Sequence, residues 1–164
     1  MRMLDIETLT IVLTGASVIV AVVYGILTLR ETNRARQAEL YMAIYEKASA
    51  PEFWEAYDLY VEKSKWNNFT EYLEMYQNDP NFRTAANRLH AFYEGLGVLV
   101  KENLLSIRFI ALFVGSHTRR FWEKVRGHIQ EGRKVVGIPR WGSETEYLYN
   151  ELMRYIEKHP ELKT

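Results

Sequence analysis

Residues 8–30 read TLTIVLTGASVIVAVVYGILTLR, and this stretch decides how the chain folds. The 22 residues from Thr8 to Leu29 carry no formal charge. An α-helix of that length spans about 33 Å, which matches the hydrocarbon core of a bilayer at about 30 Å. We therefore predict that residues 8–29 form a transmembrane helix.

The alternative for this stretch is a cleaved signal peptide. The apolar region of a signal peptide is usually only about 7–15 residues long and follows a positively charged leader. Here the leader MRMLDIE contains two acidic residues, Asp5 and Glu7, and only one basic residue, Arg2. No A-x-A cleavage pattern follows the apolar residues. These features favour an uncleaved span. A second span over residues 96–115 is not expected, because three charged side chains interrupt it.

Basic residues gather on the C-terminal side of the apolar stretch. Only Arg2 precedes it, whereas three arginines follow it closely: Arg30, Arg34 and Arg36. The positive-inside rule then places residues 1–7 outside the cell membrane and the chain from residue 30 onward in the cytoplasm. The glycosylation sequon at residues 68–70 would indicate the opposite orientation, but such triplets often occur by chance. The predicted localisation is a single-pass protein of the cell membrane.

Polar and small residues recur within the apolar stretch in alternating steps of four and three, the spacing of a heptad seam. The seam consists of Thr10, Thr14, Ser17, Ala21, Tyr24 and Thr28, and Gly25 extends a ladder of small residues beside it. Helices in a bilayer associate through close packing of small residues and through hydrogen bonds. The seam therefore predicts a parallel homo-oligomer. The alternative is a lone anchor whose hydroxyl groups bond to the backbone of their own helix.

A pore is the alternative function for this helix. If four or more copies turned the seam toward a central axis, hydroxyl groups would line that axis and could conduct ions or water. No Asp, Glu, Lys or Arg lies within residues 8–29 to select the sign of an ion.

The segment after the span is predicted to continue the same helix. No Gly or Pro occurs between Ile26 and Ala50, and residues 30–48 are rich in helix-forming residues. We therefore expect residues 30–48 to leave the bilayer as an unbroken juxtamembrane helix.

Residues 49–164 are predicted to form a cytoplasmic α-helical domain. Ser49 and Ser143 each precede a glutamate by three residues, so each predicts a capping box. No hairpin dipeptide joins two alternating runs, so almost no strand is expected and the fold class is all-α, with the span leading into a helical bundle.

The run from Asn81 to Glu102 predicts the central helix of this domain. Its apolar face would comprise Ala85, Leu89, Phe92, Leu96 and Leu99. Gly95 and Gly97 lower the intrinsic stability of this helix, so they are predicted to permit the close approach of a neighbouring helix.

Composition excludes several kinds of chemistry. The chain has 21 basic and 21 acidic residues, and this balance argues against a dedicated nucleic-acid partner. It has no cysteine, so thiolate catalysis and cysteine metal sites are excluded. The four histidines form no H-E-x-x-H pattern and are interpreted as surface or core-edge residues, and no phosphate loop or triad is recognisable. We predict no catalytic residues, no metal and no cofactor; a membrane-tethered enzyme would need a convergent polar pocket.

Charge is nonetheless unevenly distributed along the chain. Residues 46–81 contain eight acidic residues and three lysines, whereas residues 116–140 contain seven basic residues and two glutamates. The favoured interpretation is that the two segments pair or remain solvated. The alternative is that the basic segment binds anionic lipid or nucleic acid, with Phe121 and Trp122 interleaved. The candidate basic patch comprises Arg119, Arg120, Lys124, Arg126, Arg133 and Lys134.

Several segments resemble a known prokaryotic family. They are LRETNRARQA, SAPEFWEAY, AFYEGLGVLVKENLLS, FWEKV and WGSETEYLYNEL, and FYEGLGVLVKENLL is the most specific of them. This pattern is similar to DUF4760, a domain of unknown function, over nearly the whole chain. The resemblance implies a single-pass membrane protein with a small helical cytoplasmic domain, and it implies no activity.

The sequence thus predicts a membrane-anchored, homo-oligomerising interaction or regulatory module without catalytic activity. Its expected partners are membrane lipid, other copies of itself and an unidentified protein.

Overall fold

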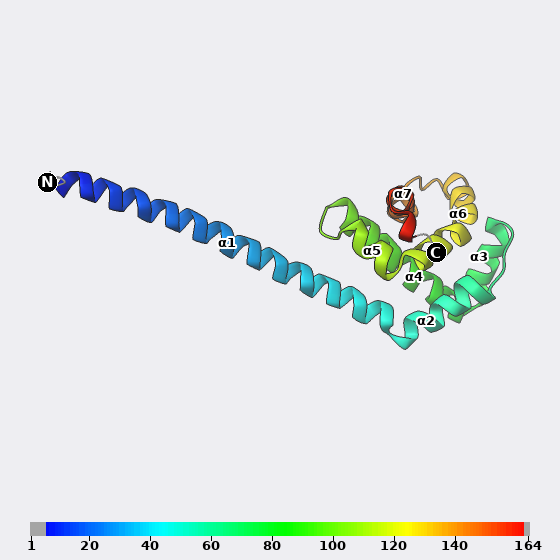
Figure 1. Ribbon diagram of the computed structural model, residues 1–164. Helices are drawn as coiled ribbons and strands as arrows, with labels where there is room; N and C mark the ends of the chain where they lie inside the picture. The colour runs from blue at the N-terminus through cyan, green and yellow to red at the C-terminus, as the bar shows by residue number, and fades with distance from the viewer. Residues whose placement is uncertain (1–5, 163–164) are drawn as a thin grey trace. The chain divides into compact units, whose positions relative to one another are not determined.

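The computed structural model describes residues 6–162, and every regular element among them is helical. The all-α fold class is therefore confirmed. Residues 1–5 of the predicted outer segment 1–7 lie outside the described residues, as do residues 163–164. In chain order (Figure 1) the elements are α1 (Ile6–Ser49), α2 (Pro51–Tyr57), the π-helical turn η1 (Asp58–Lys63), α3 (Phe69–Asn78), α4 (Pro80–Lys101), α5 (Ile107–Phe113), α6 (Gly115–Val136), α7 (Ser143–Lys158) and the 3-10 turn η2 (Pro160–Leu162).

Two compact units make up the chain, residues 1–42 and residues 43–164. The described part of the N-terminal unit belongs to α1, which runs for 44 residues without a break. At about 1.5 Å per residue, α1 is about 66 Å long. The absence of Gly and Pro between Ile26 and Ala50 explains this continuity, and α1 runs through residues 30–48 as one helix, as predicted.

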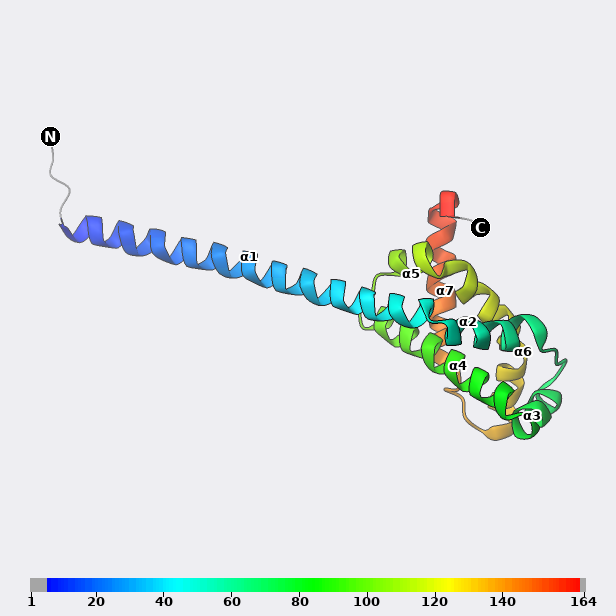
Figure 2. The same ribbon diagram turned by 90° about the horizontal axis from the view of Figure 1, so that it is seen from below.

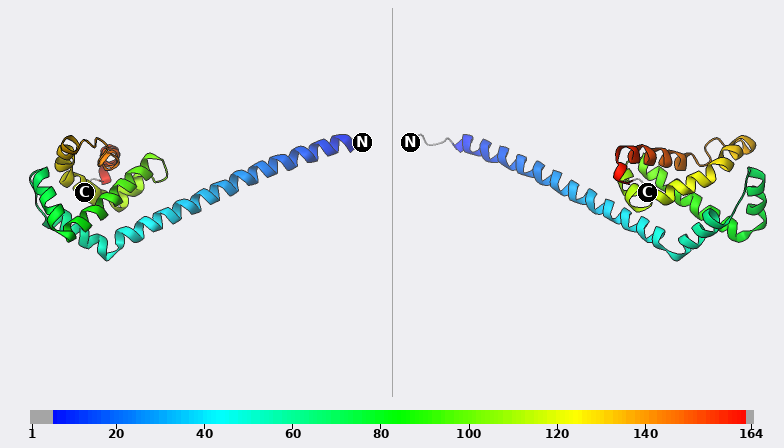
Figure 3. Two further views of the ribbon diagram at one scale, coloured as in Figure 1. Left: turned by 180° about the vertical axis from the view of Figure 1, so that it is seen from behind. Right: turned by 45° about the vertical axis from the view of Figure 1, so that its right-hand side comes forward.

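The C-terminal unit is built around α4. Helix α4 contacts α2, α3, η1 and α7, and α6 packs against α3, α5 and α7. Figure 2 shows that α2 runs alongside α4 and that α7 crosses α4. Figure 3 shows the same unit from two further sides, as helices joined by short loops. Its fully buried core includes Tyr60, Phe82, Leu89, Tyr93, Ile110, Phe121, Val125, Ile129, Leu148 and Leu152.

The buried stripe of α4 differs from the predicted face. Leu89 and Leu96 are buried as expected, but Phe92 and Leu99 are only half-buried, while Tyr93 is fully buried. The reason is that α4 has neighbours on more than one side. A helix enclosed by several partners buries a wider stripe than the single face that periodicity describes.

The capping boxes predicted at Ser49 and Ser143 are wrong. Ala50 and Gly142 occupy the cap positions of α2 and α7, and neither end has a side-chain cap from its own segment. At α7 the backbone N–H of Thr145 instead donates to the carboxylate of Glu94 on α4, at 3.1 Å. A tertiary contact therefore replaces the predicted capping box.

Candidate functional site

The apolar stretch of α1 leaves its side chains uncovered. Its large apolar residues from Ile11 to Leu29 have exposed fractions between 47% and 71%. Within residues 6–162, one helix is long and apolar enough to cross a membrane, and its most apolar 18-residue window has a mean hydropathy of 1.8 with no residue buried. This surface is the first candidate functional feature.

The hydroxyl groups of the seam bond to the backbone of their own helix. Thr14 donates to the carbonyl of Thr10 and Ser17 donates to the carbonyl of Leu13, each at 2.8 Å. The carbonyl of Thr28 accepts from the Thr32 hydroxyl at 2.9 Å. These bonds remove most of the cost of a hydroxyl in lipid and still leave an oxygen lone pair on the helix surface. They suit a lone anchor and a packed oligomer equally.

The remaining seam residues lie on the same helical face, because steps of three and four residues return to one side of a helix. Tyr24 has an exposed fraction of 71%, and Ala21 and Thr28 are also exposed, while Gly25 is of intermediate exposure. The three arginines that come directly after the apolar stretch lie on the same unbroken helix and are exposed: Arg30, Arg34 and Arg36.

The candidate basic patch on α6 is not one continuous cationic surface. Arg119 pairs with Glu123 at 3.7 Å on the same helix, and Arg120 pairs with Glu62 of η1 at 3.6 Å. The Arg120 pair joins the basic segment to the acidic segment within one chain, and its exposed position limits its contribution to stability.

Two further cations of the patch serve as internal contacts. Lys124 donates to the carbonyl of Ser64 at 2.6 Å and lies 4.3 Å from the centre of the Trp66 ring. Burial lowers the pKa of Lys124 from its usual value. Arg133 donates to the carbonyl of Trp141 and forms an ion pair with Glu146, each at 2.7 Å. Arg126 and Lys134 are exposed.

The aromatic residues beside these cations are unavailable for recognition. Phe121 is fully buried and Trp122 is 4% exposed. Stacking on nucleic-acid bases or insertion into lipid requires exposed rings. The alternative in which Phe121 and Trp122 are interleaved with the basic residues at a binding surface therefore has no support in the geometry.

A histidine-containing aromatic cluster lies between α4 and α6, and the sequence analysis did not predict it. Nε2 of His90 forms a 2.9 Å hydrogen bond with the hydroxyl of Tyr60, and the indole N–H of Trp66 donates to Nδ1 of His128 at 3.0 Å. The ring of Tyr72 stacks on His128 with centroids 4.1 Å apart. Burial lowers the pKa of His90 to about 4 and that of His128 to about 3, so both imidazoles are neutral near pH 7.

A sequence pattern could have revealed one of these histidines. Phe121, Val125, His128 and Gly132 recur at the spacing of a buried helical stripe, and all four are buried. A histidine on such a stripe belongs to the core and not to the core edge, which corrects the interpretation made for His128. Among residues 6–162, no three histidine, aspartate or glutamate side chains converge as a metal site would require.

A cavity of about 450 Å³ opens beside this cluster; we call it the Trp141 pocket. Its walls come from α3, α4, the end of α6 and the loop that follows α6. The Trp141 ring lies near those of Phe69, Tyr72 and His90, at centroid distances of 5.9, 6.4 and 6.4 Å. Gly132 makes this arrangement possible, because a β-carbon there would lie 2.3 Å from the Trp141 ring and 2.9 Å from that of Phe69.

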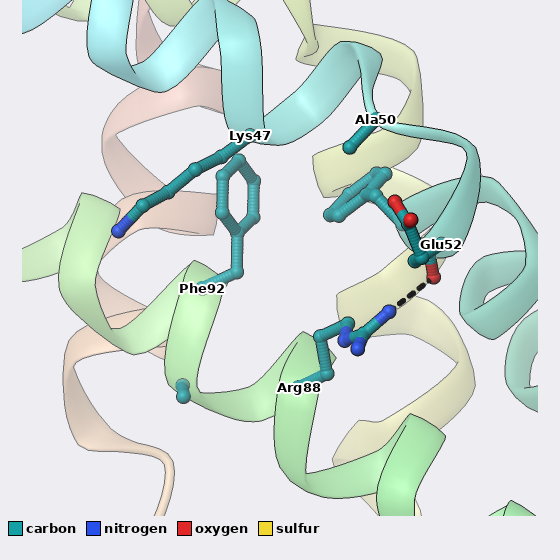
Figure 4. A pocket seen from close by; sticks show the side chains of 7 residues that line it. Lys47, Ala50, Glu52, Arg88 and Phe92 are labelled. Carbon is teal, nitrogen blue, oxygen red and sulfur yellow. Dashed lines mark hydrogen bonds between the residues drawn. The ribbon is translucent and has the colours of Figure 1, made fainter.

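A second cavity, of about 640 Å³, lies where the end of α1 meets α2 and α4; we call it the Lys47 pocket. Figure 4 shows the Lys47 side chain extending past the ring of Phe92, with Arg88 at another side. Arg88 donates to the backbone carbonyl of Glu52 at 2.7 Å. The rings of Phe53 and Phe92 meet edge to face at 4.8 Å.

A family model described as "Domain of unknown function (DUF4760)" matches residues 13–152. The chain belongs to this family. The DUF4760 match begins inside the apolar stretch and ends in α7, so it covers most of the described part of α1 together with both pockets. No curated protein and no solved structure matches the chain. Membership in DUF4760 assigns no activity to the chain.

Proposed function

We propose that the chain is a single-pass membrane protein that works as an interaction or regulatory module, with residues 8–29 in the bilayer. The observation that carries this proposal is the exposure of every described large apolar side chain from Ile11 to Leu29. Covering a large apolar side chain is worth about 1.5–3 kcal/mol, so leaving this set in water costs on the order of 10 kcal/mol. That is as large as the whole stability of a typical domain. A lipid environment removes this cost.

A water-soluble coiled coil explains the same stretch less well. A coiled coil buries its seam, and here the seam contains Thr10, Thr14 and Ser17. Such an assembly would bury hydroxyl groups and leave Ile19 and Val23 in water on the opposite face. In a bilayer the same arrangement is favourable, since small and hydroxylated residues pack between helices and branched apolar residues face lipid.

We further propose that residues 30–164 lie in the cytoplasm and that parallel copies associate through the seam. The support for the orientation is the group of exposed arginines directly after the apolar stretch: Arg30, Arg34 and Arg36. The support for association is the ladder of Ser17, Ala21 and Gly25, which lets two backbones approach closely. Among the described residues of α1, no contact favours a pore over simple packing, so the pore hypothesis remains a prediction.

Absence of cysteine makes the topology directly testable. Met3→Cys and Asn150→Cys each introduce a single thiol, the second at an exposed position of α7. A membrane-impermeant maleimide should label position 3 on intact cells and position 150 only after permeabilisation. The protein should also stay with the membrane during alkaline carbonate extraction. Recovery of the full-length chain in the aqueous fraction without detergent would refute the anchor, and reversed labelling would refute the orientation.

A further inference from the structure

The Trp141 pocket has the composition of a small-molecule site. Its volume of about 450 Å³ falls within the range of roughly 300–1,000 Å³ that such sites occupy. Aromatic rings from Phe69, Tyr72 and Trp141 form its apolar wall. Sites of this kind pair an apolar wall with a few polar groups that orient the ligand.

Among residues 6–162, Arg140 is the one charged residue that lines this pocket. Its guanidinium forms a long ion pair with Glu144, at 3.8 Å, and the Arg140 side chain is 87% exposed. The carboxylate of Glu144 is already bound by Lys101, which donates to both of its oxygens at 3.1 and 2.9 Å. Lys101 is therefore the closer cationic partner of Glu144. The Arg140 guanidinium, held only by the longer contact, remains exposed beside the pocket.

The other polar residues that line the pocket are neutral. Tyr76 donates its hydroxyl to Oδ1 of Asn87 at 2.8 Å, and both residues line the cavity. His90 also lines it, and burial keeps this imidazole uncharged near pH 7. No carboxylate lines the cavity within residues 6–162, so the pocket disfavours a cationic ligand.

We propose that the Trp141 pocket binds a small organic acid with an aromatic or aliphatic body, the body lying against Tyr72 and Trp141 and the carboxylate at Arg140. Apolar contact with the rings would supply most of the affinity, and the cation would select the head group. The Lys47 pocket makes a weaker candidate, because Arg88 is engaged by the Glu52 carbonyl and the Glu52 carboxylate also lines that cavity.

A series of ligands with one body and three head groups tests this proposal. The full chain in zwitterionic lipid nanodiscs is titrated with 3-phenylpropionate, 3-phenylpropanol or 3-phenylpropylamine, with empty nanodiscs as the blank. Tryptophan fluorescence reports binding, and Trp141→Phe identifies the source of the change. The acid should bind saturably, about five- to tenfold more tightly than the alcohol, which is the size expected for one charge-assisted contact at a partly exposed cation. The amine should bind most weakly.

Two pairs of variants locate the site. Arg140→Gln should remove the preference for the acid over the alcohol, whereas Arg126→Gln, at an exposed arginine of α6 outside the pocket, should leave it unchanged. Leu73→Trp adds bulk at the pocket wall and should abolish binding of all three ligands. Leu112→Trp makes the same change at an exposed leucine of α5 and should have no effect.

Thermal unfolding of each variant shows that it is folded before its binding is compared. Absence of saturable binding, equal affinity for the three head groups, or unchanged binding by Leu73→Trp would each overturn the proposal. The pocket lies wholly within the C-terminal unit, so these results are independent of whether α1 spans a membrane.

Discussion

Gly97 of α4 lies directly against the backbone of Glu144 at the start of α7. A β-carbon at position 97 would lie 2.1 Å from the Glu144 carbonyl oxygen and 2.5 Å from its carbonyl carbon. Both atoms belong to the backbone, so neither can move aside as the end of a flexible side chain can. Glu144 is also the residue that Lys101 of α4 binds, so the two helices are joined at this point by close approach and by an ion pair.

Gly97→Ala should therefore destabilise the C-terminal unit by roughly 2–4 kcal/mol, as overpacking against a fixed backbone does. Gly95→Ala is the matched control, because nothing lies within 4 Å of a β-carbon at position 95. Alanine there should be neutral or stabilising by about 0.5–1 kcal/mol, since glycine weakens a helix interior. Thermal or denaturant unfolding of the two variants measures the difference. Equal stability of the two variants would contradict this account.

Glu94 of α4 replaces the predicted local cap of α7. One oxygen of its carboxylate accepts from the backbone N–H of Thr145 at 3.1 Å and from the Thr145 hydroxyl at 2.8 Å. Glu94→Ala should cost about 1–2 kcal/mol of stability, the usual value of a lost cap. Ser143→Ala removes the residue that the sequence favoured as the cap, and it should cost less than 0.5 kcal/mol. If Ser143→Ala proves the more costly change in chemical denaturation, the predicted capping box is present after all.

These two contacts show what the sequence can and cannot indicate. The sequence predicted the all-α class and the unbroken α1, because each depends on local composition and periodicity. The start of α4 shows the same kind of local signal: Asp79 precedes Pro80, and its carboxylate accepts from the N–H groups of Asn81 and Phe82 at 2.8 and 3.1 Å. Such caps act within one segment and are therefore visible in sequence.

Contacts between distant segments were not predictable in the same way. Position 95 and position 97 are both glycine, and only the placement of α7 distinguishes their roles. The first backbone N–H of α3, at Phe69, likewise donates to the carboxylate of Glu131 on α6 at 2.8 Å, and the two residues are 62 positions apart in the sequence. The Trp141 pocket depends on Phe69, His90 and Trp141 meeting across three segments. A single sequence does not determine such meetings, because they follow from how whole helices pack.

Stability should fall in mild acid because of the buried histidines. The pKa of His90 is lowered from 6.5 to about 4 and that of His128 to about 3, with burial as the main cause; in His128 the neighbouring His90 and Lys124 add to it. In the unfolded chain both groups take up protons below about pH 6.5, whereas the folded chain takes them up only near pH 4 and below. The unfolded state therefore binds more protons between these values, and stability rises with pH across that window. Above about pH 6.5 both histidines are neutral in the folded and the unfolded chain, so they cause no further change in stability with pH.

Thermal unfolding followed between pH 4.5 and 7 measures this effect, and comparison with a histidine variant separates it from the carboxylates that titrate at the acid end. The loss should approach on the order of 2–3 kcal/mol per histidine toward the acid end. His128→Gln should flatten the dependence by about half. An identical slope in the His128 variant and the unsubstituted chain would show that this histidine does not titrate on unfolding.

The seam of α1 predicts which substitutions separate the proposed oligomer. Ser17→Leu with Ala21→Leu places bulk where two backbones are proposed to meet, and it should weaken association by about tenfold or more. Ile19→Leu with Val23→Leu is the matched control: at about 100° per residue these positions lie on the opposite face, and both are exposed. Light scattering in detergent gives the mass of each protein after the detergent is subtracted. We expect a monomer for the first pair and an unchanged oligomer for the second. If the unsubstituted chain is itself a monomer, or if the two pairs of substitutions have the same effect, α1 is a lone anchor whose hydroxyl groups serve only their own backbone.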